Sequence, residues 1–212
     1  TRAVLFDDAF TAQIEELRSA LTCLEFLIYI GEGSCPDWAI DAEAIIDDHS
    51  PCAPSKRGGD EMAGIFYTGG TTGFPKGVMQ SHSAIWASGM GSLPMFGMTR
   101  ESRYLHVAPM FHMADFAGGM GATLTAAQNV VLQGFDPAAV MATVATEKIT
   151  HTLLVPAMIK MLLDHPDIAA ADFSSMEKII YGASPMPAAT LQRCMELWPH
   201  IGMVQAYGQT EL

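Results

Sequence analysis

The sequence predicts an α/β fold with a mostly parallel β-sheet flanked by helices. In the second half of the chain, short apolar runs typical of strands alternate with longer stretches of helical periodicity. Strands and helices that alternate at this spacing are typical of α/β architecture. Of the 212 residues, 50% are hydrophobic, which is ample for a sizeable core and excludes disorder as the main state.

Residues 1–59 are predicted to hold a helix, a buried strand and a connecting segment. Residues 9–21 place apolar side chains at helical spacing, and the run Leu24–Ile30 that follows is almost entirely apolar. From Gly31 to Gly59 the composition shifts to glycine, proline, serine and aspartate, and a short helix is compatible with Trp38–Ile46. This stretch is interpreted as a connection over the surface.

Residues 60–212 are predicted to form the core of the domain, which opens with a hairpin. Ala63–Tyr67 is predicted as a strand, Thr68–Lys76 as a glycine-rich turn, and Gly77–Gln80 as a second short strand. Ser81 is then suited to cap the start of a helix. The two strands imply a hairpin closed by a loop large enough to hold a phosphate group.

Strands and helices alternate through the rest of the chain. The predicted strands are Tyr104–Ala108, Asn129–Leu132, Thr150–Val155, Lys178–Tyr181 and Met203–Ala206. The predicted helices lie near residues 116–126, 137–148, 157–164 and 187–197. Asp136 before Pro137, and the prolines before the last helix, are helix-start signals.

The charge balance excludes nucleic acid as a partner. Eleven Lys and Arg against 23 Asp and Glu give a net charge of −12, which repels phosphate backbones and anionic lipid headgroups. A phosphate ligand therefore has to be held locally by backbone N–H groups, hydroxyls, and a lysine or bound cation. Uninterrupted apolar runs fall far short of the roughly 20 residues that cross a bilayer, so membrane association of the protein has no signal here.

The chain has four cysteines, Cys23, Cys35, Cys52 and Cys194. They form no paired Cys-x-x-Cys motif, so neither a zinc site nor a dense disulfide framework is indicated. We expect reduced, buried thiols and a cytoplasmic location.

The residues best suited to bind a phosphate group are concentrated in the glycine-rich loop, Thr68–Gly77. Four glycines, three threonines and one lysine fall within these ten residues. Glycines let backbone N–H groups approach a polyphosphate, the hydroxyls donate further hydrogen bonds, and Lys76 supplies a positive charge. Ordinary hairpin turns need only one or two glycines, so the composition favours a site for nucleotide phosphates.

Two well-known phosphate loops do not fit this segment. A Walker loop places Gly-Lys-Ser/Thr at the start of a helix, whereas Lys76 lies between Pro75 and Gly77. The glycines also lack the Gly-x-Gly-x-x-Gly spacing of dinucleotide-binding Rossmann folds. A P-loop NTPase and a Rossmann dehydrogenase are therefore not supported.

The run from Tyr67 to Gly77 closely resembles the signature of the adenylate-forming superfamily, which includes acyl-CoA synthetases, firefly luciferase and the adenylation domains of peptide synthetases. Gly69 stands where most members carry serine, a variant similar to the long-chain fatty acid branch. Three later segments match the family in order and rough spacing, namely Pro109–His112, Gly182–Pro187 and Tyr207–Glu211. The resemblance covers residues 67–211 and implies a partial N-terminal domain of the acetyl-CoA synthetase-like fold.

This resemblance implies an AMP-forming acid–thiol ligase. A carboxylic acid would react with ATP to give acyl-AMP and pyrophosphate, and the acyl group would then form a thioester with coenzyme A. In such a reaction the protein mainly positions the reactants and neutralises the charge of the phosphate groups. The implied cofactors are ATP, Mg²⁺ and coenzyme A as a co-substrate, and the implied partner is a small-molecule carboxylic acid.

The resemblance also gives roles to individual residues. The β- and γ-phosphates would be covered by Lys76 and by Thr68, Gly69, Gly70, Thr71, Thr72 and Gly73. Thr210 would contact the α-phosphate, and Glu211 would ligate Mg²⁺, which prefers carboxylate and phosphate oxygens. His112 would lie near the substrate carboxylate. The base and the acyl carbonyl would lie against Gly182, Ala183, Ser184, Tyr207, Gly208 and Gln209.

Several of these residues also have an ordinary structural interpretation. Tyr207, which offers an aromatic face to adenine, is by itself a typical core residue. His112 has no spacing partner and can be an ordinary hydrogen-bonded histidine, and His82, next to Ser81, is interpreted as structural. The methionines of residues 90–120 suit either an adaptable acyl tunnel or an irregular core.

By the family pattern, Leu212 comes one residue after the metal ligand. The ribose-binding aspartate, the hinge and the C-terminal domain with its catalytic lysine are therefore expected to be missing, as is the beginning of the large domain. We expect the 212 residues to be a central fragment of an acyl-CoA synthetase that is inactive by itself.

Among the possible substrates we expect a medium- or long-chain fatty acid, on the basis of Gly69, the methionines and the overall resemblance. Two alternatives within the enzyme class stay open, an acyl-AMP ligase that loads a carrier protein and an aryl-acid CoA ligase. An alternative from another class is a non-catalytic module that binds a nucleotide or a partner.

Overall fold

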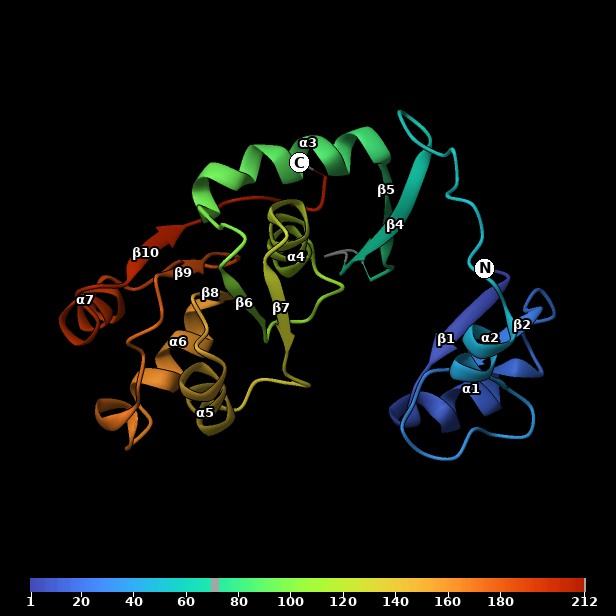
Figure 1. The fold of residues 1–212 in the computed structure, drawn as a ribbon, viewed down its shortest axis with the longest axis horizontal. Coiled ribbons are helices and arrows are strands. Elements are labelled where there is room, and N and C mark those ends of the chain that lie inside the picture. Colours follow the sequence, from blue (N-terminus) through green and yellow to red (C-terminus); the bar gives the residue numbers. More distant parts are fainter. Residues whose placement is uncertain (70–72, 212) are drawn as a thin grey trace. The chain divides into compact units, whose positions relative to one another are not determined.

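The chain divides into two units, Thr1–Lys56 and Arg57–Leu212 (Figure 1). The structure is a computed structural model that describes residues 1–69 and 73–211. Among the described residues, every helix is too short or too polar to cross a lipid bilayer.

The first unit is a three-stranded parallel sheet with two α-helices and a 3₁₀ turn. Its strands, in spatial order, are β1 (Ala3–Phe6), β2 (Phe26–Tyr29) and β3 (Ile40–Asp41). Its helices are η1 (Asp8–Phe10), α1 (Thr11–Arg18) and α2 (Ala42–Asp48). The predicted helix and strand are confirmed in shorter form, and α2 lies partly within the predicted 38–46. The prediction that the strand is buried is wrong for Phe26, which is exposed, and holds fully only for Tyr29. Strand β1 is absent from the prediction, because a four-residue apolar run shows no period.

The second unit is built around a five-stranded sheet in which all strands are parallel. The spatial order is β10 (Gly202–Gln205), β9 (Lys178–Tyr181), β8 (His151–Leu154), β6 (Arg103–His106) and β7 (Gln128–Val131). Strands β6 and β8 are neighbours although β7 separates them in the sequence, so the chain reverses its direction across the sheet between them. Each of the five predicted strands is present.

Helices cover both faces of this sheet (Figure 1). They are α3 (His82–Phe96), α4 (Met113–Thr125), α5 (Pro137–Glu147), α6 (Pro156–Leu163) and α7 (Ala188–Leu197). Leu105 and Ile179 pack with α5, α6 and α7, whereas Tyr104 and Ile180 pack on the other face with α3 and α4. The predicted parallel sheet flanked by helices is confirmed, and the four predicted helices correspond to α4–α7.

The predicted hairpin is a separate antiparallel pair formed by β4 (Met62–Thr68) and β5 (Lys76–Ser81). Thr68 pairs with Lys76 where the two strands meet the glycine-rich loop. The ring of Phe66 meets the ring of Phe116 on α4 at 5.3 Å between centroids. One face of the hairpin therefore packs against the helical layer.

Helix α3 is fixed at both ends. The hydroxyl of Ser81 accepts a hydrogen bond from the N–H of Ala84 at 3.1 Å, which confirms the predicted N-cap. At the other end Gly97 adopts φ +62°, a left-handed conformation that often ends helices. The ammonium of Lys178 on β9 donates to the carbonyl oxygen of Phe96 at 3.1 Å. The last turn of α3 is therefore anchored to the sheet.

Helix α4 packs closely on β6 because it carries glycines at the contact. A side chain at Gly118 would overlap the ring and hydroxyl of Tyr104, and a Cβ atom at Gly119 would lie 3.0 Å from His106. Tyr104 and His106 are both buried. Only a residue without a side chain fits at Gly118 while Tyr104 keeps its place.

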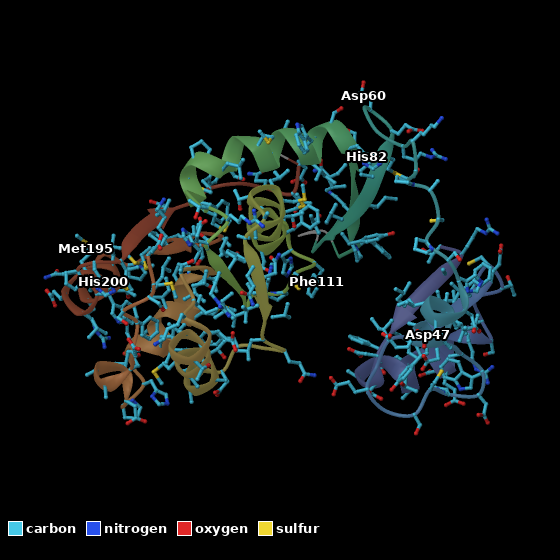
Figure 2. All side chains as sticks on the ribbon, viewed as in Figure 1. Asp47, Asp60, His82, Phe111, Met195 and His200 are labelled. Atoms are coloured by element: carbon cyan, nitrogen blue, oxygen red, sulfur yellow. The ribbon has the colours of Figure 1, made fainter. Side chains whose placement is uncertain are left out.

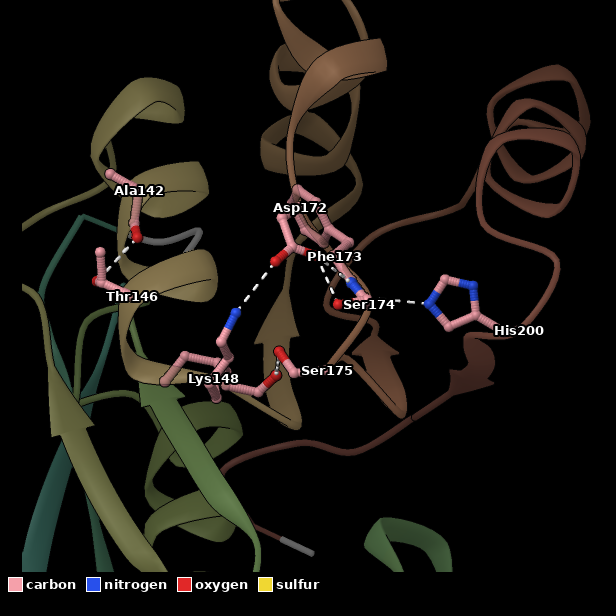
Figure 3. A network of polar contacts seen from close by, with 9 residues as sticks. Ala142, Thr146, Lys148, Asp172, Phe173, Ser174, Ser175 and His200 are labelled. Carbon is pink, nitrogen blue, oxygen red and sulfur yellow. Dashed lines mark hydrogen bonds and ion pairs between the residues drawn. The ribbon is translucent and has the colours of Figure 1, made fainter.

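A polar network joins the end of α5 to the loop before β9 (Figure 3). Lys148, at φ +51°, forms an ion pair with Asp172 at 3.1 Å, and Asp172 also accepts a hydrogen bond from the Ser174 hydroxyl. The hydrogen bonds from Ser174 and Lys148 hold the pKa of Asp172 well below its ordinary value. Nearby, His200 Nε2 lies 3.1 Å from the carbonyl oxygen of Phe173. This network fastens helix α5 to the loop that leads into β9.

All four cysteines are free thiols. Cys194 is buried and Cys35 is half-buried, but Cys23 and Cys52 are exposed, so the expectation of buried thiols is wrong for these two. Both lie in irregular segments outside the sheet, where there is no core to cover them.

Candidate active site

A cavity of about 540 Å³ lies at the carboxyl ends of the sheet strands in the second unit. Its wall includes the end of β8 and the segments that follow β6, β9 and β10, together with residues of α3, α4 and α6. These strands lie at or next to the point between β6 and β8 where the strand order of the sheet changes direction. Open parallel sheets bind their ligands at such a position.

The segment after β6 brings His112 to the cavity wall. His112 is the N-cap residue of α4, and its ring lies 4.5 Å from the ring of Phe111, which is labelled in Figure 2. Within the described residues, no side chain caps this end of α4, so backbone N–H groups of its first turn remain available. A carboxylate is stabilised at such a helix end.

Gly182 and Ala183 reach the wall directly after β9. Gly182 is buried, and a side chain there would overlap the carbonyl oxygen of Ala206, because the chain after β10 passes against it. Ala183 has φ +64°, a conformation that residues with side chains adopt only with strain. Ser184, also predicted to bind the nucleotide, is exposed and does not belong to the wall.

The segment after β10 contributes Tyr207, Gly208, Gln209 and Thr210 to the wall. Tyr207 is 84% exposed, so its interpretation as a core residue is wrong. The Gln209 amide donates a hydrogen bond to the Tyr207 hydroxyl at 3.1 Å, and the exposed ring offers an aromatic surface to a planar group. Because β9 and β10 are neighbours, this segment and Gly182–Ala183 lie side by side.

The hairpin reaches the same region through β5. The side-chain amide of buried Gln80 donates a hydrogen bond to the backbone carbonyl oxygen of Thr210. Lys76 and Thr68 lie at the base of the loop, where the Thr68 hydroxyl donates to the Lys76 carbonyl oxygen at 3.4 Å. The hairpin and the Thr210 segment are therefore in contact.

The glycine-rich loop itself does not contribute to the cavity wall within the described residues. Gly69 and Gly73 are exposed, and Gly73 has φ +92°, which favours glycine at this position. The predictions for Gly70, Thr71 and Thr72 lie outside the described residues.

Glu211, the predicted metal ligand, is exposed and follows the wall residue Thr210. Among the described residues, no three His, Cys, Asp or Glu side chains are grouped closely enough to hold a metal ion. Mg²⁺ commonly takes only one or two protein carboxylates, with phosphate oxygens and water as its other ligands. An exposed carboxylate beside the wall fits such a site, in which the nucleotide would supply the remaining ligands.

Part of the cavity wall is apolar, and this part comes from α3, β8 and α6. It consists of Met95, Phe96, Leu153, Val155 and Met158. Among the methionines of residues 90–120, Met95 and Met113 line the cavity, whereas Met98 is buried in the core. An adaptable wall and an irregular core therefore each account for some of the methionines.

A buried polar network in the cavity wall is absent from the sequence prediction. Asp115 of α4 accepts hydrogen bonds from the Tyr104 hydroxyl at 3.0 Å and from His106 Nδ1 at 2.7 Å. His106 Nε2 lies 2.8 Å from Asn129 Oδ1 on β7. Asp115 has no exposed surface, although it belongs to the cavity wall. One signal for this network exists in the sequence, since an aspartate in an apolar, glycine-rich helix requires a buried partner.

The network changes the acid–base properties of its members. Burial lowers the pKa of His106, but the hydrogen bonds with Asp115 and Asn129 outweigh burial and leave this pKa above its ordinary value. Burial and the Asp115 carboxylate raise the pKa of Tyr104 well above its ordinary range. Both shifts favour an imidazolium and a neutral phenol around the Asp115 carboxylate.

The raised pKa of His106 makes one part of the stability depend on pH. In the unfolded chain this pKa is about 6.5, so the stabilisation is fully present below about pH 6. It is lost as the pH rises through the higher pKa of the folded state, at about 1.4 kcal/mol for each pH unit between the two values. We expect urea unfolding to show that, between these two pKa values, the free energy of unfolding of the wild type falls toward that of His106→Gln as the pH rises. A difference between the two proteins that stays constant from acid to alkaline pH would contradict the assignment.

Known proteins are similar to this chain over nearly its whole length. The family model described as AMP-binding enzyme matches residues 2–212. The medium/long-chain-fatty-acid–CoA ligase FadD8 of Mycobacterium tuberculosis is 34% identical over 209 residues, which cover 96% of this chain and 35% of that protein. An indoleacetate–CoA ligase of Aromatoleum aromaticum is 30% identical over 213 residues, which cover 99% of this chain and 41% of that protein.

A solved structure has the same fold. The inhibitor-bound N-terminal domain of FACL13 from Mycobacterium tuberculosis matches with a TM-score of 0.83 and 23% identity, covering 100% of this chain and 51% of that one. The match supports the fold and confirms the expected likeness to an N-terminal domain. The chain spans only 35% and 41% of the length of the two curated relatives.

Proposed function

The chain belongs to the AMP-binding enzyme family, and on this basis we propose that the protein containing it activates a carboxylic acid with ATP and transfers the acyl group to coenzyme A. One observation is the main support for this proposal. The cavity at the carboxyl ends of the strands brings together His112, the Gly182–Ala183 segment and the Tyr207–Thr210 segment, which are far apart in the sequence.

Each of these groups supports one part of the proposed reaction. The open ring of Tyr207 and the small residues after β9 suit a purine base and a close-lying acyl carbonyl. Thr210, a residue of the cavity wall, would donate a hydrogen bond to the α-phosphate. His112 and the uncapped start of α4 suit the substrate carboxylate, whose oxygen would attack the α-phosphorus as pyrophosphate leaves.

Charge neutralisation would come from two groups beside the cavity. Lys76 stands at the base of the glycine-rich loop and would meet the β- and γ-phosphates. Glu211 would hold Mg²⁺, which when bound neutralises phosphate charge. Gln80 connects the two parts, because it lies on the hairpin strand that starts at Lys76 and holds the carbonyl group of Thr210.

We further propose a medium- or long-chain fatty acid as the substrate. The apolar wall formed by Met95, Phe96, Leu153, Val155 and Met158 supports a hydrocarbon chain, and the flexible methionines suit chains of different length. The 34% identity with a medium/long-chain-fatty-acid–CoA ligase agrees with this choice. In the protein that contains this chain, a lower KM for dodecanoate than for indoleacetate is expected, and the reverse order would favour an aryl acid.

Nucleotide binding by the chain tests the proposed site directly. We expect calorimetry to show that α,β-methylene-ATP binds more tightly with Mg²⁺ than without it. Glu211→Gln should abolish this gain and weaken binding in Mg²⁺ by about tenfold, which corresponds to about 1.4 kcal/mol. Glu196→Gln, which changes an exposed glutamate on α7, is the matched control and should behave as wild type.

Two outcomes of this experiment would contradict the proposal. If wild type fails to bind the analogue, the nucleotide site is wrong. If Glu211→Gln keeps the full response to Mg²⁺, the metal ligand is wrong. Because the chain spans 35% and 41% of the two CoA ligases, we expect it to bind the nucleotide without forming acyl-CoA by itself.

A further inference from the structure

The side chain of Asp115 is a buried carboxylate in the wall of the proposed acid site. Its surface is fully covered, yet it belongs to the cavity wall together with its neighbours Met113 and Ala114. Its two oxygens accept hydrogen bonds from the Tyr104 hydroxyl and from His106 Nδ1, and no part of the side chain is exposed to a ligand. Any influence on a bound acid therefore passes through the position of α4.

Stability alone does not account for a buried ion pair at this place. Apolar side chains of similar volume usually stabilise a protein as well as a buried pair does, because the charges lose their hydration. The surroundings are otherwise apolar, since Tyr104 belongs to a cluster with Phe96, Ala122 and Ile180. The pair of Asp115 and His106 adds a directional contact. Hydrogen bonds fix the orientation of α4 on β6, which apolar contacts do not.

The hydrogen bonds of Asp115 fix the position of the first turn of α4. Asp115 is the third residue after the N-cap His112, so the two lie within one turn of each other. Its partners lie on β6, at the other end of the segment that carries Ala108, Pro109 and His112 along the cavity. The pair therefore ties together both ends of the segment that presents His112.

Two further contacts make this tie specific. Gly118 and Gly119 let α4 approach β6 closely enough for the hydrogen bonds to form. Asn129 holds the outer nitrogen of His106 and extends the network to β7. The hydrogen bond from His106 Nδ1 also offsets part of the negative charge of the Asp115 carboxylate, which would otherwise repel a carboxylate at the start of the same helix.

We propose that Asp115 is a positioning residue of the acid site, which acts through His106 to fix the first turn of α4 and the His112 side chain against the bound acyl group. This inference rests on the proposed function. It predicts that loss of the pair weakens recognition of the acyl group while leaving recognition of the nucleotide unchanged, since the nucleotide segments follow β9 and β10.

The test compares two ligands of the same chain, AMP and the stable acyl-adenylate analogue 5′-O-(N-dodecanoylsulfamoyl)adenosine. Asp115→Asn keeps the size of the side chain but removes its charge. We expect its affinity for AMP to stay at the wild-type level, and its affinity for the acyl analogue to fall by about ten- to a hundredfold, which corresponds to about 1.4–2.7 kcal/mol. Calorimetry measures both affinities.

A matched control comes from the same strand. Arg103 of β6 forms an ion pair at 2.6 Å with Glu147 of α5, outside the cavity wall. Glu147→Gln should leave both affinities unchanged. Asn129→Ala removes an exposed residue of the network and should give a smaller loss for the acyl analogue alone, so the test remains decisive even if Asp115→Asn fails to fold.

The outcomes separate this inference from the proposed function. If wild type binds neither ligand, the proposed function fails and the inference with it. If wild type prefers the acyl analogue and both network variants keep that preference, the function stands and the positioning role is wrong. An equal loss for AMP and the acyl analogue in both variants would assign the pair a purely structural role and would also overturn the inference.

Discussion

Gly182→Ala is expected to weaken nucleotide binding by about a hundredfold. The new Cβ atom would overlap the backbone carbonyl oxygen of Ala206, and a backbone group cannot rotate away as the end of a side chain can. Ala206 is itself held to β9, because its N–H donates to the Tyr181 carbonyl oxygen at 2.8 Å. The strain must therefore separate the segments after β9 and β10, which carry the proposed adenine and α-phosphate contacts.

The expected size of this effect follows from the cost of overpacking. Inserting a methyl group into a closed contact costs about 1–3 kcal/mol, and we place Gly182→Ala near 3 kcal/mol, equivalent to about a hundredfold loss of AMP affinity. Gly134→Ala is the control, since a Cβ atom there has no neighbour within 4 Å. Near-wild-type AMP affinity for Gly182→Ala in calorimetry would show that the cavity does not bind the nucleotide.

Gly118→Ala is expected to cause the largest loss of stability among single methyl additions in α4. Its Cβ atom would overlap the ring and hydroxyl of Tyr104, which is fully buried between Phe96 and the His106 ring. The helix must then lift from β6 and break the bonds of Asp115. We expect the free energy of unfolding to fall by about 3 kcal/mol, at the upper end of the usual overpacking cost.

Hydrogen exchange of the β6 amides measures this loss in the second unit alone. Gly91→Ala, in helix α3 with no neighbour within 4 Å of the new atom, is the control and should raise stability by up to about 1 kcal/mol, because alanine favours helix. Combining Gly118→Ala with Tyr104→Ala should cost less than the sum of the single changes. Additive costs would mean that the two residues do not meet.

The sequence predicts much of the fold because local signals agree with the final structure. Asp136 and Pro137 mark the start of α5, and Asp136 accepts the expected hydrogen bond from the Ala139 N–H at 2.8 Å. The composition of the hairpin predicts β4 and β5 for the same reason. Helix α4 begins at Met113, earlier than the predicted 116, because no capping side chain marks its start.

The site is predictable only where residues cluster in the sequence. The segments at residues 109–112, 182–187 and 207–211 are short motifs, and the sheet brings most of their residues to one cavity. The Asp115 network has no such motif, since its members belong to a strand, a helix and a second strand. The contact between Gln80 and Thr210 spans 130 residues, so it depends on the tertiary fold alone.

The small side chains in the cavity wall offer a route to redesigned substrate range. Ala114 and Ala117 of α4 face the cavity, while glycines on the same helix hold it against β6. Exchanging Ala117 for valine or leucine would fill part of the cavity from a fixed surface, without shifting the strands that carry the nucleotide segments. Under the proposed function, such a series would measure how acyl chain length depends on cavity size, because each added methylene group would shorten the longest chain that the wall admits.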